Sequence, residues 1–351
     1  MKIQASSFIH NEVIGGRKWP ELLREKDASS RIVSGWEAKE GQIPHQLSIR
    51  MVNPNGAVNA CGATIISAGW GLTAAHCTAG RVTVVIRAGV VNLTQPAVIF
   101  ETTKYINHPL YNEADQSTVQ PHDIGLLEFG RELVFSDTVQ PIRLQRSSDK
   151  NRNYEDAVAI ASGWGRTWTG GASPENMNWV YLMLTSNAEC LTAFGGSSII
   201  QDSTICAKGY NVTSQSTCQG DSGGPLTVID DDGLISQVGV TSFVSALGCH
   251  AGLPAGFVRP GHYLDWFETV TGIDFDWTYE DTTPETTETP ESSESPESPE
   301  SEESEESEES EESEESEESE ESEESEESEE SEESEESEES EESEESEESE
   351  E

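Results

Sequence analysis

The chain has 351 residues, and its 69 acidic and 19 basic side chains give a net formal charge of −50. Residues 281–351 hold 41 of the acids and no base, so residues 1–280 have a net charge of only −9. No stretch approaches the roughly 18 apolar residues of a membrane span, and nothing resembles the basic surplus of a nucleic-acid-binding protein. Composition therefore excludes an integral membrane protein, argues against a nucleic-acid binder, and separates a region able to bury a core from an acidic appendage.

The first segment, residues 1–31, is polar, lacks cysteine and ends at Arg31, directly before the apolar pair Ile32-Val33. This pattern predicts a removable leader. It contains no apolar run of the roughly 7 to 15 residues that a secretory signal requires. An export signal is therefore not visible in this sequence.

From residue 32 to about residue 259, short runs rich in Val, Ile, Thr and aromatic residues alternate with Gly, Asn, Asp and Pro clusters. Examples are Thr64–Ile66, Val82–Arg87 and Gln237–Val244. Many short strands separated by turn residues are typical of β-barrels or β-sandwiches. Between Pro260 and Gly272, large apolar residues recur at helical spacing and a glycine follows, which predicts one closing amphipathic helix.

The last segment, residues 274–351, is rich in Thr, Pro, Glu and Ser, and from Ser301 onward it consists of 17 copies of Ser-Glu-Glu. Nothing in it offsets the chain entropy lost on folding, and its like charges repel one another. The sequence therefore predicts a disordered, low-complexity acidic tail.

Six cysteines lie in the first 280 residues: Cys61, Cys77, Cys190, Cys206, Cys218 and Cys249. They allow 15 pairings, and none forms a C-x-x-C pair or stands at zinc-ligand spacing from a histidine. Disulfides are thus favoured over a metal site, and we expect neither a metal nor a cofactor. The sequons at Asn92 and Asn211 are glycosylation candidates that agree weakly with export.

Three local motifs carry side chains for acyl transfer: Thr73-Ala-Ala-His76-Cys77, Asp123-Ile-Gly-Leu-Leu127, and Gly220-Asp-Ser222-Gly-Gly-Pro225. A serine nucleophile needs a base, a carboxylate that orients the base, and amides that stabilise the oxyanion. His76, Asp123 and Ser222 supply the three side chains. The glycines around Ser222 let the amides of Gly220 and Ser222 point to one spot, the predicted oxyanion hole.

These motifs, in this order, resemble the chymotrypsin family of serine endopeptidases, and in particular arthropod digestive chymotrypsins and collagenolytic enzymes. The resemblance covers residues 32–273 and implies an all-β fold of two six-stranded antiparallel β-barrels with a C-terminal helix. It implies that Ser222 is the nucleophile, His76 the general base and Asp123 its orienting group. It also implies three disulfides: Cys61 to Cys77, Cys190 to Cys206, and Cys218 to Cys249.

The resemblance further implies a zymogen. Cleavage between Arg31 and Ile32 would free the Ile32 amine to pair with the buried carboxylate of Asp221. Asn59 departs from the family pattern, because several family zymogens have a histidine there that holds this aspartate inactive. How the uncut chain is kept silent is not predicted by the sequence.

By the same resemblance, Ser216 forms the floor of the specificity pocket, Val244 and Ala255 form its walls, and Ser242 and Phe243 line the substrate groove. A neutral floor cannot pair with a basic substrate side chain. We therefore expect cleavage after Phe, Tyr or Leu, with an elastase-like preference for small residues as the alternative. A shift of the wall from Ala255 to Gly256 would widen the pocket.

The sequence thus predicts a secreted, extracellular serine endopeptidase that acts on proteins and peptides, needs an activating protease and forms an acyl-enzyme. The alternative is an acidic interaction protein that binds calcium or polycationic partners through its tail. The remaining histidines of the domain are expected to be structural: His45, His108, His122, His250 and His262.

Overall fold

A computed structural model of the chain describes residues 3–4 and 35–278. The predicted cleavage site at Arg31-Ile32 lies outside the described residues, as does the acidic tail beyond residue 278. β1 (Ile3–Gln4) pairs in parallel with β17 (Ile273–Asp274). No helix among residues 3–4 and 35–278 is long and apolar enough to cross a membrane.

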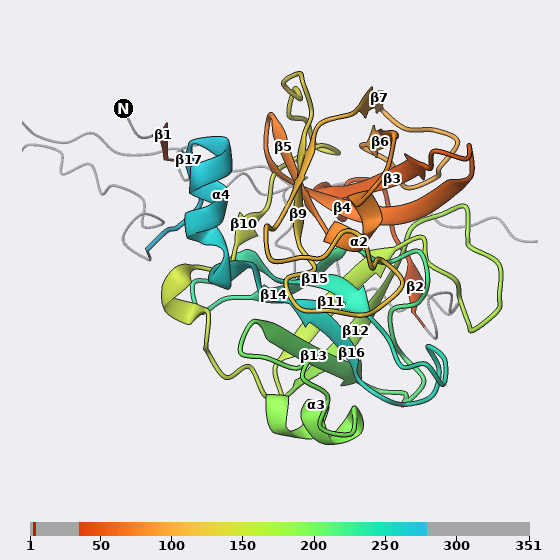
Figure 1. Ribbon diagram of the computed structural model, residues 1–351, viewed down its shortest axis with the longest axis vertical. Helices are drawn as coiled ribbons and strands as arrows, with labels where there is room; N and C mark the ends of the chain where they lie inside the picture. Colours follow the sequence, from red (N-terminus) through yellow and green to blue (C-terminus); the bar gives the residue numbers. More distant parts are fainter. Residues whose placement is uncertain (1–2, 5–34, 279–351) are drawn as a thin grey trace, which may run out of the picture. The chain divides into compact units, whose positions relative to one another are not determined.

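The first sheet has seven antiparallel strands, drawn in orange to yellow in Figure 1. Their order is β7 (Val98–Thr102), β6 (Thr83–Ala88), β3 (Gln46–Val52), β4 (Val58–Ser67), β5 (Trp70–Thr73), β9 (Gly125–Glu128) and β8 (Tyr105–Asn107). The two edge strands, β7 and β8, are separated in the chain only by residues 103–104. One interrupted strand therefore supplies both edges, which curls the sheet into an incomplete barrel.

The second sheet closes into a six-stranded antiparallel barrel, because its pairings form a ring. The ring runs through β11 (Val158–Gly163), β12 (Asn178–Thr185), β13 (Thr204–Gly209), β16 (Ala255–Val258), β15 (Ile235–Phe243) and β14 (Pro225–Ile229), and returns to β11. β10 (Arg143–Leu144) and β2 (Trp36–Glu37) add short pairings to β15 and β12.

Strand alternation places the cores inside these sheets. In β6, Val84, Ile86 and Ala88 are fully buried while the residues between them are not, as expected for a strand with one face on the core. One apolar cluster fills the first sheet and a separate cluster fills the second. The two-barrel fold predicted from the sequence is confirmed, although the first barrel is the less complete one.

The predicted C-terminal helix is shorter than its sequence pattern. A turn of 3₁₀ helix, η4 (Pro260–His262), precedes α4 (Leu264–Thr271), which is capped by Gly272 with a left-handed φ of +73°. Leu264 and Phe267 of α4 join the core of the first sheet. The helix that follows the second barrel in the chain thus packs against the core of the first barrel. At the other end of the described domain, β2 precedes the first barrel in the chain and pairs with β12 of the second.

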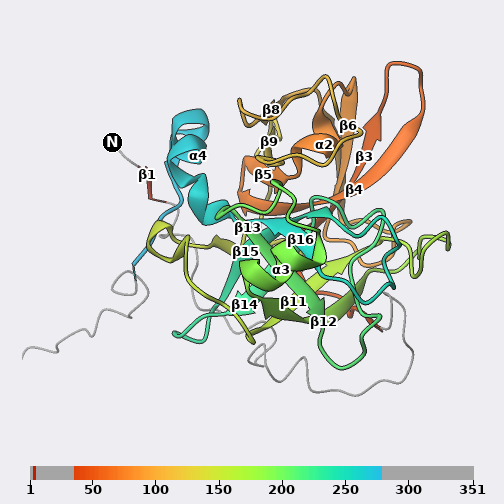
Figure 2. The same cartoon turned by 60° about the horizontal axis from the view of Figure 1, so that its bottom comes forward.

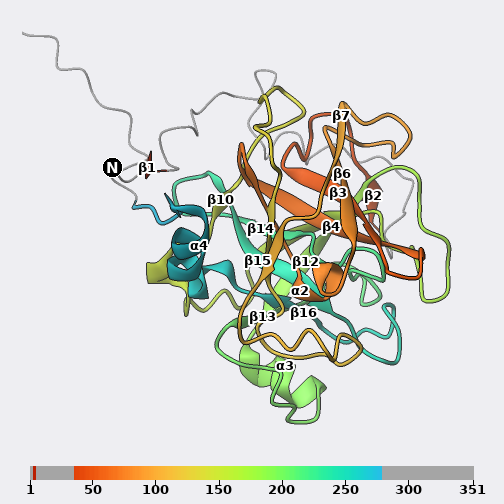
Figure 3. The same cartoon turned by 45° about the horizontal axis from the view of Figure 1, so that its top comes forward.

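The other helices are brief: α2 (Ala75–Thr78), η3 (Ser147–Asp149) and α3 (Asn187–Ala193). Figures 1 and 3 show α3 on the side of the second barrel away from the first, and α2 where the two barrels meet. Figure 2 shows the orange strands of the first barrel on one side and the green and teal strands of the second on the other. α2 is the element that brings His76 to this junction.

Three disulfides join the same pairs that the family resemblance implies. Cys61–Cys77 ties α2 to β4, and Cys190–Cys206 ties α3 to β13. Cys218–Cys249 ties the loop before β14 to the loop before β16. Two of the three therefore fasten segments that carry predicted site residues.

Candidate active site

The three predicted catalytic residues come from both barrels. His76 lies on α2, and Asp123 lies two residues before β9, so the first barrel supplies both. Ser222 lies in the loop between β13 and β14 of the second barrel. The interface between the barrels is therefore where these side chains can meet.

Asp123 holds His76 by two hydrogen bonds. The backbone N–H of His76 donates to Oδ1 of Asp123 at 2.8 Å, and Nδ1 of the imidazole lies 2.7 Å from Oδ2. Ser242 Oγ also donates to Oδ2, at 2.5 Å. The sequence placed Ser242 in the substrate groove and gave no sign that its hydroxyl supports the carboxylate.

The pKa values of this pair move in opposite directions. Burial favours the neutral imidazole, but the attraction and hydrogen bond of Asp123 outweigh it and raise the pKa of His76. Burial also opposes ionisation of Asp123, yet His76 and the hydrogen bond from Ser242 lower the pKa of this carboxyl below its usual value. An ionised carboxylate fixes the proton on Nδ1 and leaves Nε2 as the unprotonated nitrogen, with Cys77 Sγ 3.7 Å away.

The Ser222 loop is held from both barrels. Gly62 N–H donates to the carbonyl of Ser222, and Gly223 N–H donates to Thr241 O, each at 2.7 Å. Gly223 has a φ of +77°, and a Cβ there would lie 2.2 Å from Thr73 Oγ1. Only glycine fits this position, so the backbone at Ser222 is fixed by contacts that a side chain would disrupt.

Gly220, predicted to contribute to the oxyanion hole, has a φ of +105°. A Cβ there would lie only 3.0 Å from Gly165 Cα. The turn is closed by Asp221 N–H, which donates to Cys218 O at 3.0 Å. The residue must therefore be glycine for the chain to enter the Ser222 turn in this shape.

Asp221 is fully buried directly before Ser222. Its carboxylate accepts hydrogen bonds from the backbone N–H groups of Gly165 at 2.8 Å and Cys218 at 2.9 Å. Burial nevertheless raises its pKa to about 6. A nearby cation would therefore stabilise the ionised carboxylate. The predicted partner, the amine of Ile32, lies outside the described residues.

The predicted pocket residues lie in the second barrel and its loops. Ser216 is buried, and Val244 packs against both the Cys218–Cys249 disulfide and the core of the barrel. Ala255 is buried in that core. A Cβ at Gly256 would lie 2.1 Å from Cζ of Phe243, so the face of Gly256 is already covered by an aromatic ring.

Phe243 has an aromatic neighbour that the sequence did not indicate. The rings of Phe194 and Phe243 lie edge to face, with centroids 5.2 Å apart. Phe194 follows α3, which the Cys190–Cys206 disulfide fastens to the barrel. The predicted groove thus has an apolar side built from two distant segments.

The histidines expected to be structural make local contacts. His45 is buried, and burial lowers its pKa to about 3. His108 and His122 stack with ring centroids 5.0 Å apart, and His122 Nδ1 lies 3.1 Å from the Tyr263 hydroxyl. His250 Nδ1 lies 2.9 Å from Thr169 Oγ1, and His262 Nε2 lies 3.0 Å from Lys150 O.

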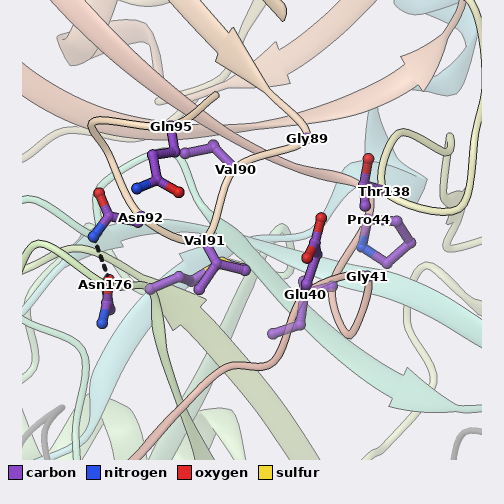
Figure 4. Close-up of a pocket in the computed structure, with 12 residues that line it drawn as sticks. Glu40, Gly41, Pro44, Gly89, Val90, Val91, Asn92, Gln95, Thr138 and Asn176 are labelled. Carbon is purple, nitrogen blue, oxygen red and sulfur yellow. Dashed lines mark hydrogen bonds between the residues drawn. The ribbon is translucent and has the colours of Figure 1, made fainter. Parts of the chain in front are cut away.

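The two glycosylation candidates differ in their surroundings. Asn92 is half-buried in a cavity of about 260 Å³ between Glu40 and Asn176, and its Nδ2 donates to Asn176 Oδ1 at 2.9 Å, as Figure 4 shows. Asn211 is exposed. In the folded chain, Asn211 is thus more exposed to solvent than Asn92.

One group of potential metal ligands gathers among the residues that the structure describes, namely Cys61, His76 and Cys77. The two sulfurs form a disulfide bond with each other, and the His76 imidazole is hydrogen-bonded to Asp123. Without a thiolate, this group lacks the donors of a zinc site.

The comparisons with known proteins agree with this geometry. The sequence model of the family described as Trypsin matches residues 32–267. The chain belongs to the trypsin family. The collagenase of Hypoderma lineatum is 34% identical over 70% of this chain and 89% of its own, and the chymotrypsin-like elastase family member 1 of Rattus norvegicus is 31% identical over 70% and 91%. The solved structure of HL collagenase has a TM-score of 0.61 at 32% identity and covers 69% of this chain and 99% of its own.

Family membership makes this chain a serine protease, and proteins are its substrates. The matched residues start at Ile32 and end at Phe267, within α4. Residues 1–31 and the Ser-Glu-Glu repeats lie outside that match.

Proposed function

We propose that the chain is a secreted serine endopeptidase that is made as a zymogen, and that His76, Asp123 and Ser222 are its catalytic triad. The bond between Asp123 and His76 Nδ1 carries this proposal. Nε2 of His76 takes the Ser222 proton as the hydroxyl attacks the scissile carbonyl, and later gives it to the leaving amine. The amides of Gly220 and Ser222 stabilise the oxyanion, and water hydrolyses the acyl-enzyme.

A serine-directed phosphonate tests the triad. It should label the cleaved enzyme at Ser222, as located by mass spectrometry of the labelled peptide. Ser222→Ala should remove the label and nearly all turnover, with a loss on the order of a millionfold. Labelling at another serine, or a Ser222→Ala variant that retains more than about a few per cent of wild-type turnover, would overturn the assignment.

We infer a preference for Phe, Tyr or Leu before the cleaved bond, with an elastase-like preference for small residues as the alternative. The neutral Ser216 supports an apolar preference, because a buried cation above it would lack a partner. The packing of Val244 against the Cys218–Cys249 disulfide favours the narrower alternative. Cleavage of a random peptide library by the wild type and by Val244→Gly decides between them.

The two specificities give different library results. If Val244 narrows the pocket, the glycine variant shifts the preference toward aromatic residues. If the wild type already prefers Phe and the variant does not change it, Val244 is not a pocket wall. A dominant preference for Arg or Lys would contradict the assignment of Ser216 to the pocket floor.

The activation proposal is that an activating protease cuts after Arg31 and that Ile32 then pairs with Asp221. The buried carboxylate of Asp221, with its raised pKa, supports this pairing. The domain boundaries proposed from the sequence are a leader over residues 1–31, a protease domain over residues 32–273 and a tail over residues 274–351.

For the tail, we propose a flexible polyanion that binds calcium or polycationic partners weakly at many sites. Its 34 carboxylates in residues 301–351 support this reading. Truncation after Thr278 should leave peptide cleavage unchanged and abolish low-salt retention on immobilised polylysine. Equal retention of both forms would contradict a binding role.

A further inference from the structure

Arg81 follows α2, the short helix that carries His76. The last turn of a helix leaves carbonyl groups without helical partners, and α2 has only four residues (Ala75–Thr78), so this applies to every carbonyl of α2 except the first. Ala79 N–H donates to Ala75 O at 2.9 Å. The other three carbonyls must be satisfied from elsewhere.

Arg81 supplies a donor to each of these three carbonyls. Its backbone N–H donates to Thr78 O at 3.1 Å. Its side chain donates from Nε to Cys77 O at 3.1 Å and from Nη2 to His76 O at 3.2 Å. The carbonyl of His76 itself is therefore held by a guanidinium, whose planar fork reaches two acceptors at once.

The same guanidinium also contacts the β3–β4 hairpin. Nη1 donates to Asn53 Oδ1, and Asn53 Nδ2 donates to Ala57 O at 2.9 Å and to Asn59 Oδ1 at 2.6 Å. The backbone of Arg81 is itself fixed, because Tyr105 donates its hydroxyl to Arg81 O at 3.2 Å. Arg81 thus joins the hairpin to the helix of the catalytic base.

We propose that Arg81 is a positioning residue of the protease, because its backbone N–H and its guanidinium together hold three carbonyls of the helix that presents His76. The inference rests on the proposed role of His76. Neither the motif around His76 nor the family match assigns a role to residue 81.

The charges that face His76 show what this cation does. Asp123 favours the imidazolium and dominates, whereas Arg81 opposes it and moderates the raised pKa of His76. Tyr111 packs against Ala75 and Ala79 of the same segment, and burial raises the pKa of its phenol, so it stays neutral. Of these three side chains that lie around His76, Arg81 is the one with a positive charge.

Three variants of the cleaved enzyme separate the effect of the Arg81 hydrogen bonds from the effect of its positive charge. Arg81→Met removes both the fork and the charge, and Arg81→Lys keeps the charge but cannot reach all the acceptors. Arg131→Met is the matched control, because Arg131 is an exposed arginine of the same barrel that lies 5.6 Å from the Phe100 ring centroid. Turnover is normalised to the sites that the phosphonate labels, so unfolded protein does not count.

For Arg81→Met, we expect kcat to fall about tenfold with KM nearly unchanged, as the loss of charge-assisted hydrogen bonds implies. The acid limb of the pH profile of kcat/KM should shift to higher pH by about half a unit, because the His76 imidazolium loses a repulsive neighbour and its pKa rises. Arg81→Lys should lower kcat without moving the limb. Arg131→Met should change neither.

An unchanged kcat in Arg81→Met would overturn the positioning role. An acid limb that stays in place in Arg81→Met, or that moves equally in Arg131→Met, would overturn the electrostatic role. A failure of the triad itself is distinguishable, because it would show as retained turnover in His76→Ala, whatever Arg81 does.

Discussion

The surroundings of Asp123 and Asp221 differ in one respect that decides their chemistry. Both side chains are buried, and burial opposes ionisation of both. Asp123 accepts hydrogen bonds from His76 and Ser242, and its pKa falls below the usual value. Asp221 accepts only from two backbone amides among the described residues, and its pKa rises to about 6. When two carboxyl groups are both buried, their hydrogen-bond and charge partners decide whether the pKa falls or rises.

The site of Asp221 is nevertheless shaped around its carboxylate. A Cβ at Gly165 would lie 2.3 Å from Asp221 Oδ2, and one at Gly163 would lie 2.3 Å from Oδ1. The two glycines at positions 163 and 165 therefore leave room for the Asp221 carboxylate. The fold supplies a hydrogen-bonding imidazole for Asp123, and we propose that cleavage supplies an ammonium for Asp221.

The largest expected effect is at Asp123. Asp123→Asn should lower kcat about ten-thousandfold, a magnitude known for the same substitution in this family. It removes the anion that stabilises the imidazolium, so the acid limb of the residual activity should also move to lower pH. Asp265→Asn, at an exposed aspartate of α4, is the control for pH-rate measurements. A loss below a hundredfold would mean that another group orients His76.

A smaller loss is expected at Asp221. In the cleaved enzyme, Asp221→Asn should lower kcat/KM by about a hundredfold or more, because a buried ammonium without its partner costs about 3–5 kcal/mol. In the uncut chain, the same change should leave the phosphonate labelling at its low level. Full activity of cleaved Asp221→Asn would show that the enzyme does not need an ion pair between Asp221 and the Ile32 amine.

The smallest effect concerns His45, a buried base with no hydrogen-bond partner for Nε2 among the described residues. Burial lowers its pKa from 6.5 to about 3, so the folded state binds fewer protons than the unfolded state below pH 6.5. Stability is full above that pH and falls toward pH 3, by about 2 kcal/mol at pH 5.

Urea unfolding between pH 7 and pH 4 measures this dependence. His45→Leu should flatten the decline, and His250→Leu, at an exposed histidine, should leave it in place. An equally steep decline in His45→Leu would place the acid-sensitive group elsewhere.

Much of the site could be predicted because its residues lie in short motifs. The glycines beside Ser222 and the cysteine beside His76 are local signals, and short runs rich in Val, Ile, Thr and aromatic residues between turn residues predicted the strands. The bond between Asp123 and His76 could be inferred only through the resemblance, since 47 positions separate the two residues.

The remaining features leave little trace in the sequence. Arg81 acts on backbone carbonyls, which every residue carries, so its role has no motif. Ser242 reaches Asp123 across 119 positions, and Phe194 packs against Phe243 from the end of α3, which a disulfide joins to β13. The closing helix began later than its pattern, because η4 occupies Pro260–His262.

The most direct test compares one sample before and after a single cut between Arg31 and Ile32. Hydrolysis of a peptide substrate and phosphonate labelling are measured on both forms, with the cut verified by mass spectrometry of the new N-terminus. We predict that turnover and labelling at Ser222 rise together after the cut, and that acetylation of the Ile32 amine reverses both. Equal activity in the uncut chain, or full activity after acetylation, would contradict the account.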